Sequence, residues 1–205
     1  MQDSNVLQSL IRPFNPQPIL SLKTKENGGL DPTIDLKKIK LLDVEIGCGV
    51  GLHPIRYAQE NPDRTLIAIE HTTNRFQQFK SRIQNQKGSP LSNLIPIHAD
   101  GTHWTVQNLA FEGVDRYFFL YPNPSWKPKL SHLRFHRTSW MSWAISSLKP
   151  GGQILLATNH SPYFSEACLY YDKVWGLKPL SQNSLNSFNH KPRTHFEKKY
   201  LLRGE

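Results

Sequence analysis

The sequence has 205 residues, of which 38% are hydrophobic and 20% are charged, and its mean hydropathy is −0.52. This length fits one domain with its own buried core, and the absence of any run of about eighteen apolar residues argues against a membrane span. The N-terminus lacks the basic start and apolar run of a signal peptide, so a cytoplasmic location is expected. Cys48 and Cys168 are the only cysteines, which argues against a disulfide framework, and the His and Cys spacings predict no metal site.

The formal net charge of +9 is unevenly distributed along the chain. Residues 1–120 contain 13 basic and 12 acidic side chains, whereas residues 121–205 contain 12 basic and 4 acidic ones, so the second part has a net charge of +8. This asymmetry favours an anionic partner, with nucleic acid as the first candidate. A basic surface that only meets solvent is the alternative interpretation.

Residues 1–35 are rich in Pro, Asn, Gln and Ser and are expected to form a loosely ordered N-terminal arm, followed by a single domain at 36–205. Strands are predicted at residues 41–46, 66–70, 94–97, 117–121, 154–157 and 196–202. Helices are predicted at residues 52–58, from a cap at Asn74 to a point before Gly88, and at 103–111, 133–148 and 163–174. This alternation predicts a doubly wound, mostly parallel α/β sheet with an antiparallel last strand. Pro96 cannot donate to a strand ladder, so its strand is expected at an edge of the sheet.

A rigid polar corner follows the strand predicted at 117–121. Pro122 and Pro124 flank Asn123, stiffen the backbone and remove two backbone donors. Ligands of open parallel sheets bind just beyond the carboxyl ends of the strands. Asn123 is therefore placed where a reacting group would lie.

A glycine-rich turn at residues 47–51, with the spacing Gly-x-Gly-x-Gly, joins the first strand to the first helix. Glu70 ends the next strand, at the distance where an acid hydrogen-bonds a ribose diol, so an adenosine-containing cofactor is favoured. Glu45, just before the turn, would repel a pyrophosphate but suits the sulfonium and ammonium groups of S-adenosylmethionine. Asp100, at the end of the third strand, could accept from the adenine amino group.

These motifs, together with Leu-Lys-Pro-Gly-Gly at residues 148–152, resemble those of Rossmann-like S-adenosylmethionine methyltransferases. More narrowly, Phe-Leu-Tyr-Pro-Asn-Pro-Ser-Trp-Lys at 119–127 is similar to the Phe-Pro-Asp-Pro-Trp-x-Lys signature of tRNA (guanine-N7)-methyltransferases. Lys-Pro-Arg-Thr-His-Phe-Glu at 191–197 is similar to the Arg-Pro-x-Thr-Lys-Phe-Glu segment of the same family. The resemblance extends from about residue 41 to residue 202.

The resemblance implies methyl transfer to N7 of a guanine in the variable loop of tRNA, with Asn123 at the position of the catalytic aspartate. It implies that the cofactor is bound by Glu45, Gly47, Gly49, Gly51, Glu70, Asp100, Gly101 and Leu120. It also implies substrate contacts from Lys127, Asn159, Thr194, Phe196 and Glu197.

The sequence departs from the family pattern mainly on the acceptor side. Two family aspartates appear as Asn123 and Asn159, and Ser125 takes the place of the family tryptophan, with Trp126 next to it. N7 of guanine has a free lone pair, so catalysis requires positioning and stabilisation of positive charge, with no general base. Asn123 accepts hydrogen bonds but has no negative charge, and we expect a rate lower by roughly two to three orders of magnitude.

Three alternatives remain after this comparison. The first is a catalytically weak or inactive RNA-binding paralogue, which the two asparagines favour. The second is a methyltransferase for a different acceptor, and the third is a nicotinamide-dependent dehydrogenase, which the glycine spacing disfavours. The sequence does not decide between a monomer and a homodimer, or whether a partner subunit is needed.

Overall fold

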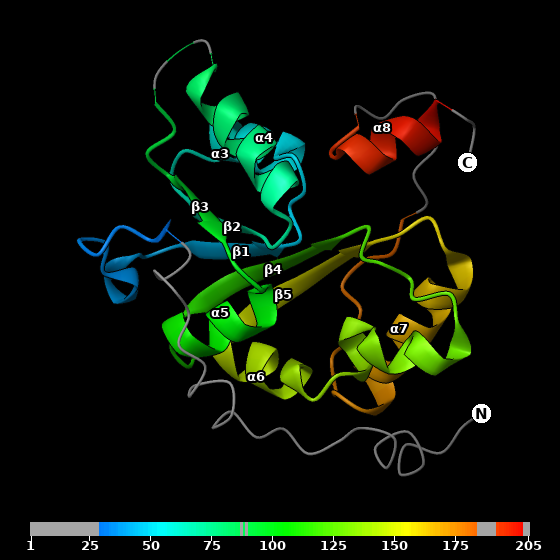
Figure 1. Cartoon of the computed structure of the whole chain (residues 1–205). Helices are drawn as coiled ribbons and strands as arrows, with labels where there is room; N and C mark the ends of the chain where they lie inside the picture. The colour runs from blue at the N-terminus through cyan, green and yellow to red at the C-terminus, as the bar shows by residue number, and fades with distance from the viewer. Residues whose placement is uncertain (1–28, 87, 89, 184–191, 203–205) are drawn as a thin grey trace.

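The computed structural model describes residues 29–86, 88, 90–183 and 192–202 (Figure 1). Within them, five strands form one sheet in the order β3-β2-β1-β4-β5, and all neighbouring strands are parallel. The strands are β1 (Leu42–Ile46), β2 (Thr65–Glu70), β3 (Leu94–His98), β4 (Val114–Leu120) and β5 (Leu148–Ala157). The predicted doubly wound α/β fold is confirmed, and so is the edge position of the strand that contains Pro96.

Helices cover both faces of this sheet (Figure 1). One face carries α3 (Leu52–Glu60) and α4 (Thr73–Gln84), and the C-terminal helix α8 (His195–Leu201) lies on the same side. The other face carries α5 (Gly101–Asn108), α6 (Trp140–Ser147) and α7 (Ser161–Lys173). Short 3-10 turns are η2 (Leu36–Lys38), η3 (Pro128–Leu133) and η4 (Phe135–Arg137).

Neighbouring residues of one strand enter two separate apolar clusters, because successive side chains of a strand point to opposite faces. Tyr117 of β4 belongs to the cluster that contains Trp104 of α5 and Trp140 of α6. The next residue, Phe118, belongs to the cluster that contains Phe79 of α4. A sheet buried on both faces is typical of parallel α/β folds.

The prediction of an antiparallel strand at 196–202 is wrong, because this segment forms the helix α8. The described residues contain no antiparallel strand. Thr194 is the N-cap of the helix, and its hydroxyl accepts a hydrogen bond from the backbone N–H of Glu197 at 3.0 Å. A threonine followed three residues later by a glutamate is a helix start signal. This signal outweighs the aromatic residues that suggested a strand.

Two predicted helix boundaries also differ from the structure. The helix predicted at 133–148 begins only at Trp140, because the backbone is extended at Arg134, between η3 and η4, and again at Thr138, between η4 and α6. The helix expected to start at Asn74 has its N-cap at Thr72. The strand predicted at 154–157 is longer in the structure, because β5 begins at Leu148 and includes the Pro-Gly-Gly segment. The other strands and helices lie within a few residues of their predicted places.

Most of the predicted N-terminal arm lies outside the described residues. At its described end, Leu30 and Ile34 pack against the core cluster that contains Trp104 and Trp140. No helix of the described segments is both long and apolar enough to cross a membrane.

Candidate active site

The turn between β1 and α3 is built for close approach of a ligand. Gly47 and Gly49 have φ angles of +79° and +61°, in the left-handed region that glycine tolerates best, and a Cβ at either position would meet no atom within 4 Å. The Gly47 and Cys48 N–H groups both donate to the carbonyl of Ile69, at 2.8 and 3.0 Å. The turn is thus hydrogen-bonded to β2, and the space next to Gly47 and Gly49 is open.

Two further glycines let helices pack tightly against the turn. A Cβ at Gly51 would lie 1.9 Å from the Phe79 ring of α4. A Cβ at Gly101, the first residue of α5, would lie 2.6 Å from Cγ2 of Ile46 at the end of β1. Leu120 is buried at the end of β4 in the same apolar cluster as Cys48 of the turn. These contacts bring the ends of β1, β3 and β4 together.

Glu45 is buried at the end of β1, with 1% of the residue exposed. Its Oε2 lies 2.7 Å from Nδ1 of His53, in the first turn of α3. A buried carboxylate requires such a partner to offset its desolvation. His53 therefore fixes the position of the Glu45 carboxyl group directly before the glycine turn.

Glu70 ends β2 with both carboxylate oxygens directed at backbone donors. Oε2 accepts from the Gly49 N–H at 2.9 Å, and Oε1 accepts from the Thr72 N–H at 2.7 Å. Each oxygen has a second lone pair, so the carboxylate can hold the turn and still accept from a ligand hydroxyl.

Asp100 follows β3 and is the N-cap of α5. Its Oδ1 accepts from the N–H groups of Thr102 and His103, at 2.9 and 3.0 Å. Burial alone would raise the pKa of Asp100, but the hydrogen bonds from Thr102 and His103 outweigh it and lower the pKa below its ordinary value. Asp100 is ionised at neutral pH, close to the ends of β1 and β2.

These groups fit S-adenosylmethionine. Three carboxylates follow three adjacent strands around an open glycine turn, and open space next to Gly47 and Gly49 leaves room for a ligand against the backbone. A ligand with ribose hydroxyls, an amino group and a positive charge matches this donor set. No group of three or more His, Cys, Asp or Glu side chains in the described part of the chain could hold a metal ion.

The corner after β4 is stiff and locally strained. Tyr121 and Ser125 have φ angles of +54° and +48°, which is unusual for residues with a side chain. Oδ1 of Asn123 accepts from the Ser125 N–H at 3.0 Å, an Asx turn that closes the corner. Asn123 itself is exposed. Because β4 lies next to β1, the corner stands at the same edge of the sheet as the glycine turn.

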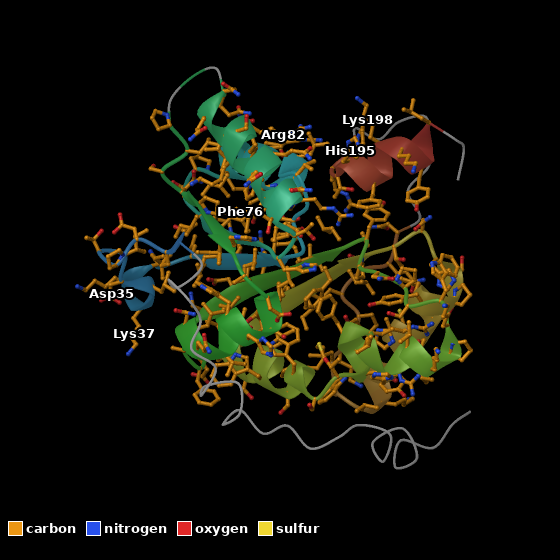
Figure 2. The ribbon with its side chains drawn as sticks, in the orientation of Figure 1. Asp35, Lys37, Phe76, Arg82, His195 and Lys198 are labelled. Carbon is orange, nitrogen blue, oxygen red and sulfur yellow. The ribbon has the colours of Figure 1, made fainter. Side chains whose placement is uncertain are left out.

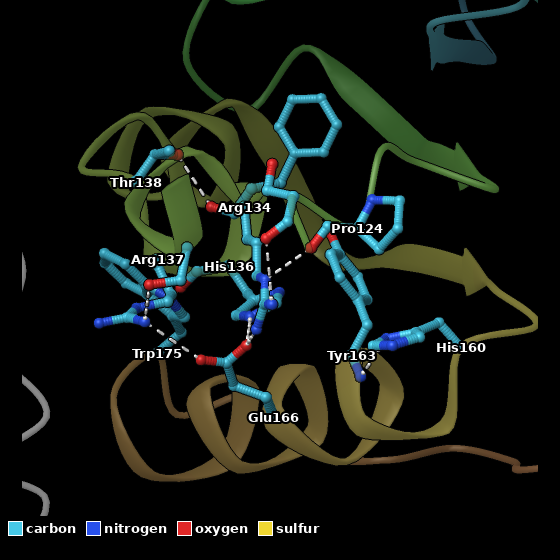
Figure 3. A network of polar contacts seen from close by, with 12 residues as sticks. Pro124, Arg134, His136, Arg137, Thr138, His160, Tyr163, Glu166 and Trp175 are labelled. Carbon is cyan, nitrogen blue, oxygen red and sulfur yellow. Dashed lines mark hydrogen bonds and ion pairs between the residues drawn. The ribbon is translucent and has the colours of Figure 1, made fainter. Parts of the chain in front are cut away.

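An ion-pair network supports the corner from the side of α7 (Figure 3). Nε of Arg134 donates to the Pro124 carbonyl at 2.9 Å, and its Nη1 is paired with the carboxylate of Glu166. Glu166 also contacts Nε2 of His136 at 3.2 Å and Nη1 of Arg137 at 3.3 Å. Burial opposes ionisation of Glu166, but hydrogen bonds from His136 and Arg134 lower its pKa to about 2. The Pro124 carbonyl is thereby linked to α7 through two side chains.

Helix α8 is tied to the corner by Glu197, which is buried with 1% exposed. Its Oε1 accepts from the Tyr121 hydroxyl at 3.0 Å and from Nη2 of Arg193 at 2.8 Å. Burial and the nearby carboxylate raise the pKa of Tyr121 to about 12, so its hydroxyl remains a donor at neutral pH. Phe196 lies 5.9 Å from the Arg75 guanidinium of α4, and Lys198 points away from the sheet (Figure 2).

The structure thus divides the predicted substrate-binding residues into two groups. Lys127 and Asn159 are exposed, and the two segments that carry them are in contact, because the neighbouring Trp126 and His160 have ring centroids 4.2 Å apart. Thr194 and Glu197 instead have structural partners within the chain, as the N-cap of α8 and the link to Tyr121.

Four residues of this site were missed by sequence reasoning: His53, Tyr121, Arg134 and Glu166. One signal was available, because Glu166 is the only acidic residue between Arg116 and Tyr171. A lone acid in a basic stretch suggests an ion-pair partner. The pairing of His53 with Glu45 depends on the angle at which α3 leaves the turn, and no sequence spacing specifies that angle.

Comparisons with known proteins place this geometry in a family. Residues 40–205 match a family model described as "Putative methyltransferase". A tRNA (guanine-N(7)-)-methyltransferase of Aquifex aeolicus is 28% identical over 169 residues, covering 82% of this chain and 54% of the relative. One of Chlorobium phaeobacteroides is 26% identical over 172 residues, covering 82% and 78%. A solved structure titled "Structure of an Antibiotic Related Methyltransferase" has a TM-score of 0.58 at 17% identity, covering 81% of this chain and 83% of that one.

The sheet order and the similarity to that solved structure define a Rossmann-like α/β fold. The family match extends over most of the sequence, and the chain belongs to this methyltransferase family. The resemblance to tRNA (guanine-N7)-methyltransferases is likewise confirmed by relatives of that name. The chain spans about half the length of the Aquifex relative and 62% of the length of a relative from Mycolicibacterium gilvum.

Proposed function

We propose that the chain transfers a methyl group from S-adenosylmethionine to N7 of a guanine in the variable loop of tRNA. The observation that supports this most strongly is that a glycine turn with three carboxylates and a Tyr-Pro-Asn-Pro corner share one edge of the sheet. The tRNA (guanine-N(7)-)-methyltransferases of Aquifex and Chlorobium are similar to the chain over 82% of its residues.

The glycine turn and the acidic strand ends are assigned to the cofactor. S-adenosylmethionine, when bound, supplies a methyl group on a positively charged sulfur. Glu45 offers a carboxyl group held in place by His53 beside the turn, and Glu70 offers its remaining lone pairs to ribose hydroxyls. Asp100 offers an acceptor to an amino group. Gly47, Gly49, Gly51 and Gly101 keep the backbone close, and Leu120 forms an apolar wall.

The corner is assigned to the guanine. N7 of guanine has a free lone pair, so the chain needs to place the base and stabilise the positive charge that the base acquires. Oδ1 of Asn123 already accepts from the Ser125 N–H, which leaves one lone pair for a base N–H group. An aspartate would keep the same turn and add a free oxygen and a negative charge. We therefore infer a functional but slow reaction.

A second candidate function is an RNA-binding protein with weak or no methyl transfer. It is favoured by the exposed amide of Asn123, whose carbonyl oxygen is engaged in the turn, together with the net charge of +8 in residues 121–205. This candidate predicts salt-dependent tRNA binding without turnover. A methyltransferase for another acceptor predicts tight cofactor binding without tRNA binding.

The three possibilities separate in one set of measurements. Unmodified tRNA is incubated with the protein and isotopically labelled S-adenosylmethionine, and the digested nucleosides are analysed by mass spectrometry. Labelled 7-methylguanosine is the expected product. The absence of any product at high enzyme excess would rule out the proposed activity, and parallel binding measurements for tRNA and cofactor would then distinguish the other two.

A further inference from the structure

Trp126 presents a fixed aromatic ring to solvent directly after the corner. The residue is 70% exposed, although a tryptophan is usually largely buried. Its ring meets the His160 ring at a centroid distance of 4.2 Å and an angle of 80°. His160 is itself held in place, because its Nδ1 accepts from the Tyr163 N–H at 3.0 Å (Figure 3). The orientation of Trp126 is therefore set by a neighbour while most of its surface stays open.

The backbone that precedes Trp126 is held in an unfavourable conformation. Ser125 has a φ angle of +48°, which destabilises a residue with a side chain. Its N–H donates to Asn123, and its carbonyl accepts from Nη2 of Arg134 at 3.4 Å. Strain of this kind persists where the surrounding structure enforces it, and it is concentrated at ligand sites. An exposed ring on a strained turn that two hydrogen bonds hold in place has the fixed orientation that a ligand-binding position needs.

The cations next to Trp126 are available to an anion. Lys127 and Lys129 are exposed, and neither side chain forms an ion pair or hydrogen bond with another residue in the described ranges. By contrast, Arg134 and Arg137 are both paired with Glu166. An exposed aromatic ring followed closely in the chain by unpaired cations suits single-stranded nucleic acid, because the ring can stack on a base while the cations meet neighbouring phosphates.

We propose that Trp126 is a stacking platform for an unpaired nucleobase of the RNA substrate, with Lys127 and Lys129 on the adjoining phosphates. This inference rests on the proposed function for the identity of the substrate as RNA. It adds a base-binding surface that is separate from the Asn123 amide. The platform accepts any base, because every base offers a π face.

The test measures binding of a fluorescein-labelled, unmodified tRNA transcript by fluorescence anisotropy at several salt concentrations. Trp126→Ala is expected to weaken binding by about tenfold to a hundredfold, while Trp126→Phe, which keeps an aromatic face, stays within a few-fold of the wild type. The slope of log affinity against log salt is unchanged in Trp126→Ala, because stacking releases no counterions. In Lys127→Ala the slope falls by about 0.7 to 0.9.

Phe111→Ala is the matched control. Phe111 is also an exposed aromatic residue, at 67%, but it precedes β4, whereas Trp126 follows that strand. Its loss is expected to leave RNA affinity unchanged. Equal weakening by Phe111→Ala and Trp126→Ala, or wild-type affinity in Trp126→Ala, would overturn the platform. A wild-type protein that binds no RNA would overturn it as well.

Failure of the platform is distinguishable from failure of the proposed function. If the wild type forms 7-methylguanosine and Trp126→Ala has the same affinity and KM for tRNA, the proposed methylation is supported and the stacking role of Trp126 is excluded. If the wild type forms no product but Trp126→Ala binds RNA more weakly than the wild type, the stacking role of Trp126 is supported and the proposed methylation is excluded. Calorimetric titration with S-adenosylmethionine is expected to give the same Kd for both proteins.

Discussion

At the scale of single residues, Asn123 combines two tasks that compete for the same atom. Its Oδ1 closes the turn onto the Ser125 N–H, and in the proposed reaction the same oxygen faces the base. A carboxylate has two equivalent oxygens and can do both at once. The amide therefore preserves the shape of the corner while limiting its electrostatic contribution.

Asn123→Asp is expected to raise the rate of 7-methylguanosine formation by about one to three orders of magnitude, because it restores a negative charge beside the developing positive charge. Single-turnover assays with excess protein measure the chemical step directly. The affinity for S-adenosylmethionine should stay unchanged, since the hydrogen bond of the Asn123 side chain is to Ser125 within the corner, and none joins it to the glycine turn among the described residues. An unchanged or lower rate in Asn123→Asp would show that the charge argument is mistaken.

Glu70 provides a second prediction at this scale. Glu70→Gln removes a charge and leaves one of the two backbone donors, on Gly49 or Thr72, without its acceptor. We expect the affinity for S-adenosylmethionine to fall by about tenfold or more, since hydrogen bonds to charged groups contribute about 1.5 to 3 kcal/mol. Calorimetry measures the Kd. Asp35→Asn is the control, because Asp35 caps η2 and an asparagine caps equally well; similar losses in both variants would argue against a ribose role for Glu70.

At the scale of elements, α8 shows how far the sequence predicted the fold. The five parallel strands were predictable, because buried strands are short apolar runs that end at turn signals. Residues 196–202 mix aromatic, charged and aliphatic side chains, and their pattern fits the two-residue period of a strand as well as the 3.6-residue period of a helix. The hydrogen bond between Glu197 and Tyr121, 76 positions away in sequence, helps to fix the helix in place. The acidic strand ends were likewise predictable, whereas the support of the corner by Arg134 and Glu166 depends on tertiary packing.

Tyr121→Phe tests the attachment of α8. The change removes the hydroxyl that donates to the buried Glu197 carboxylate, and we expect the free energy of unfolding to fall by about 1 to 2 kcal/mol. Urea denaturation measures this change, and hydrogen exchange should show faster exchange of the α8 amides. Tyr200→Phe is matched to it, because the Tyr200 ring stacks on Tyr121 but its hydroxyl has no hydrogen bond to any described residue. Equal effects of the two variants would contradict the proposed link.

At the scale of the whole molecule, ion pairs in the acceptor part make stability depend on pH. The pKa of Glu166 is about 2 in the folded chain, against an ordinary value of 4.5. Because the folded-state pKa is the lower one, this stabilisation is complete above pH 4.5 and is lost as the pH falls from 4.5 towards 2. The shift corresponds to about 3 kcal/mol at most, for a side chain that is 21% exposed.

Glu166→Gln is therefore expected to lower stability near pH 6, and only about a quarter of this difference should remain near pH 2.5. Urea denaturation at a series of pH values measures the difference between the two proteins. Asp100, Asp115 and Glu197 also have lowered pKa values and are present in both proteins, so their contributions cancel in the comparison. Stability curves that run parallel from pH 6 to pH 2.5 would exclude Glu166 as the source.

Positive charge is concentrated in the part of the chain proposed to bind RNA and not in the part proposed to bind the cofactor. The part that contains the glycine turn has a net charge of +1, and the part that begins at the corner has +8. The excess of positive charge thus belongs to the part that contains the corner, where a polyanionic substrate is proposed to bind, and not to the part assigned to the small, singly positive cofactor.

The central claim, that this chain forms 7-methylguanosine in tRNA, is tested most directly in cells. Bulk tRNA is isolated from cells with the gene, without it, and without it but complemented by the wild-type or Glu70→Gln protein, and the nucleosides are quantified by mass spectrometry. We predict that 7-methylguanosine falls when the gene is lost and returns with the wild type but not with Glu70→Gln. An unchanged level of 7-methylguanosine in all four samples would contradict the claim.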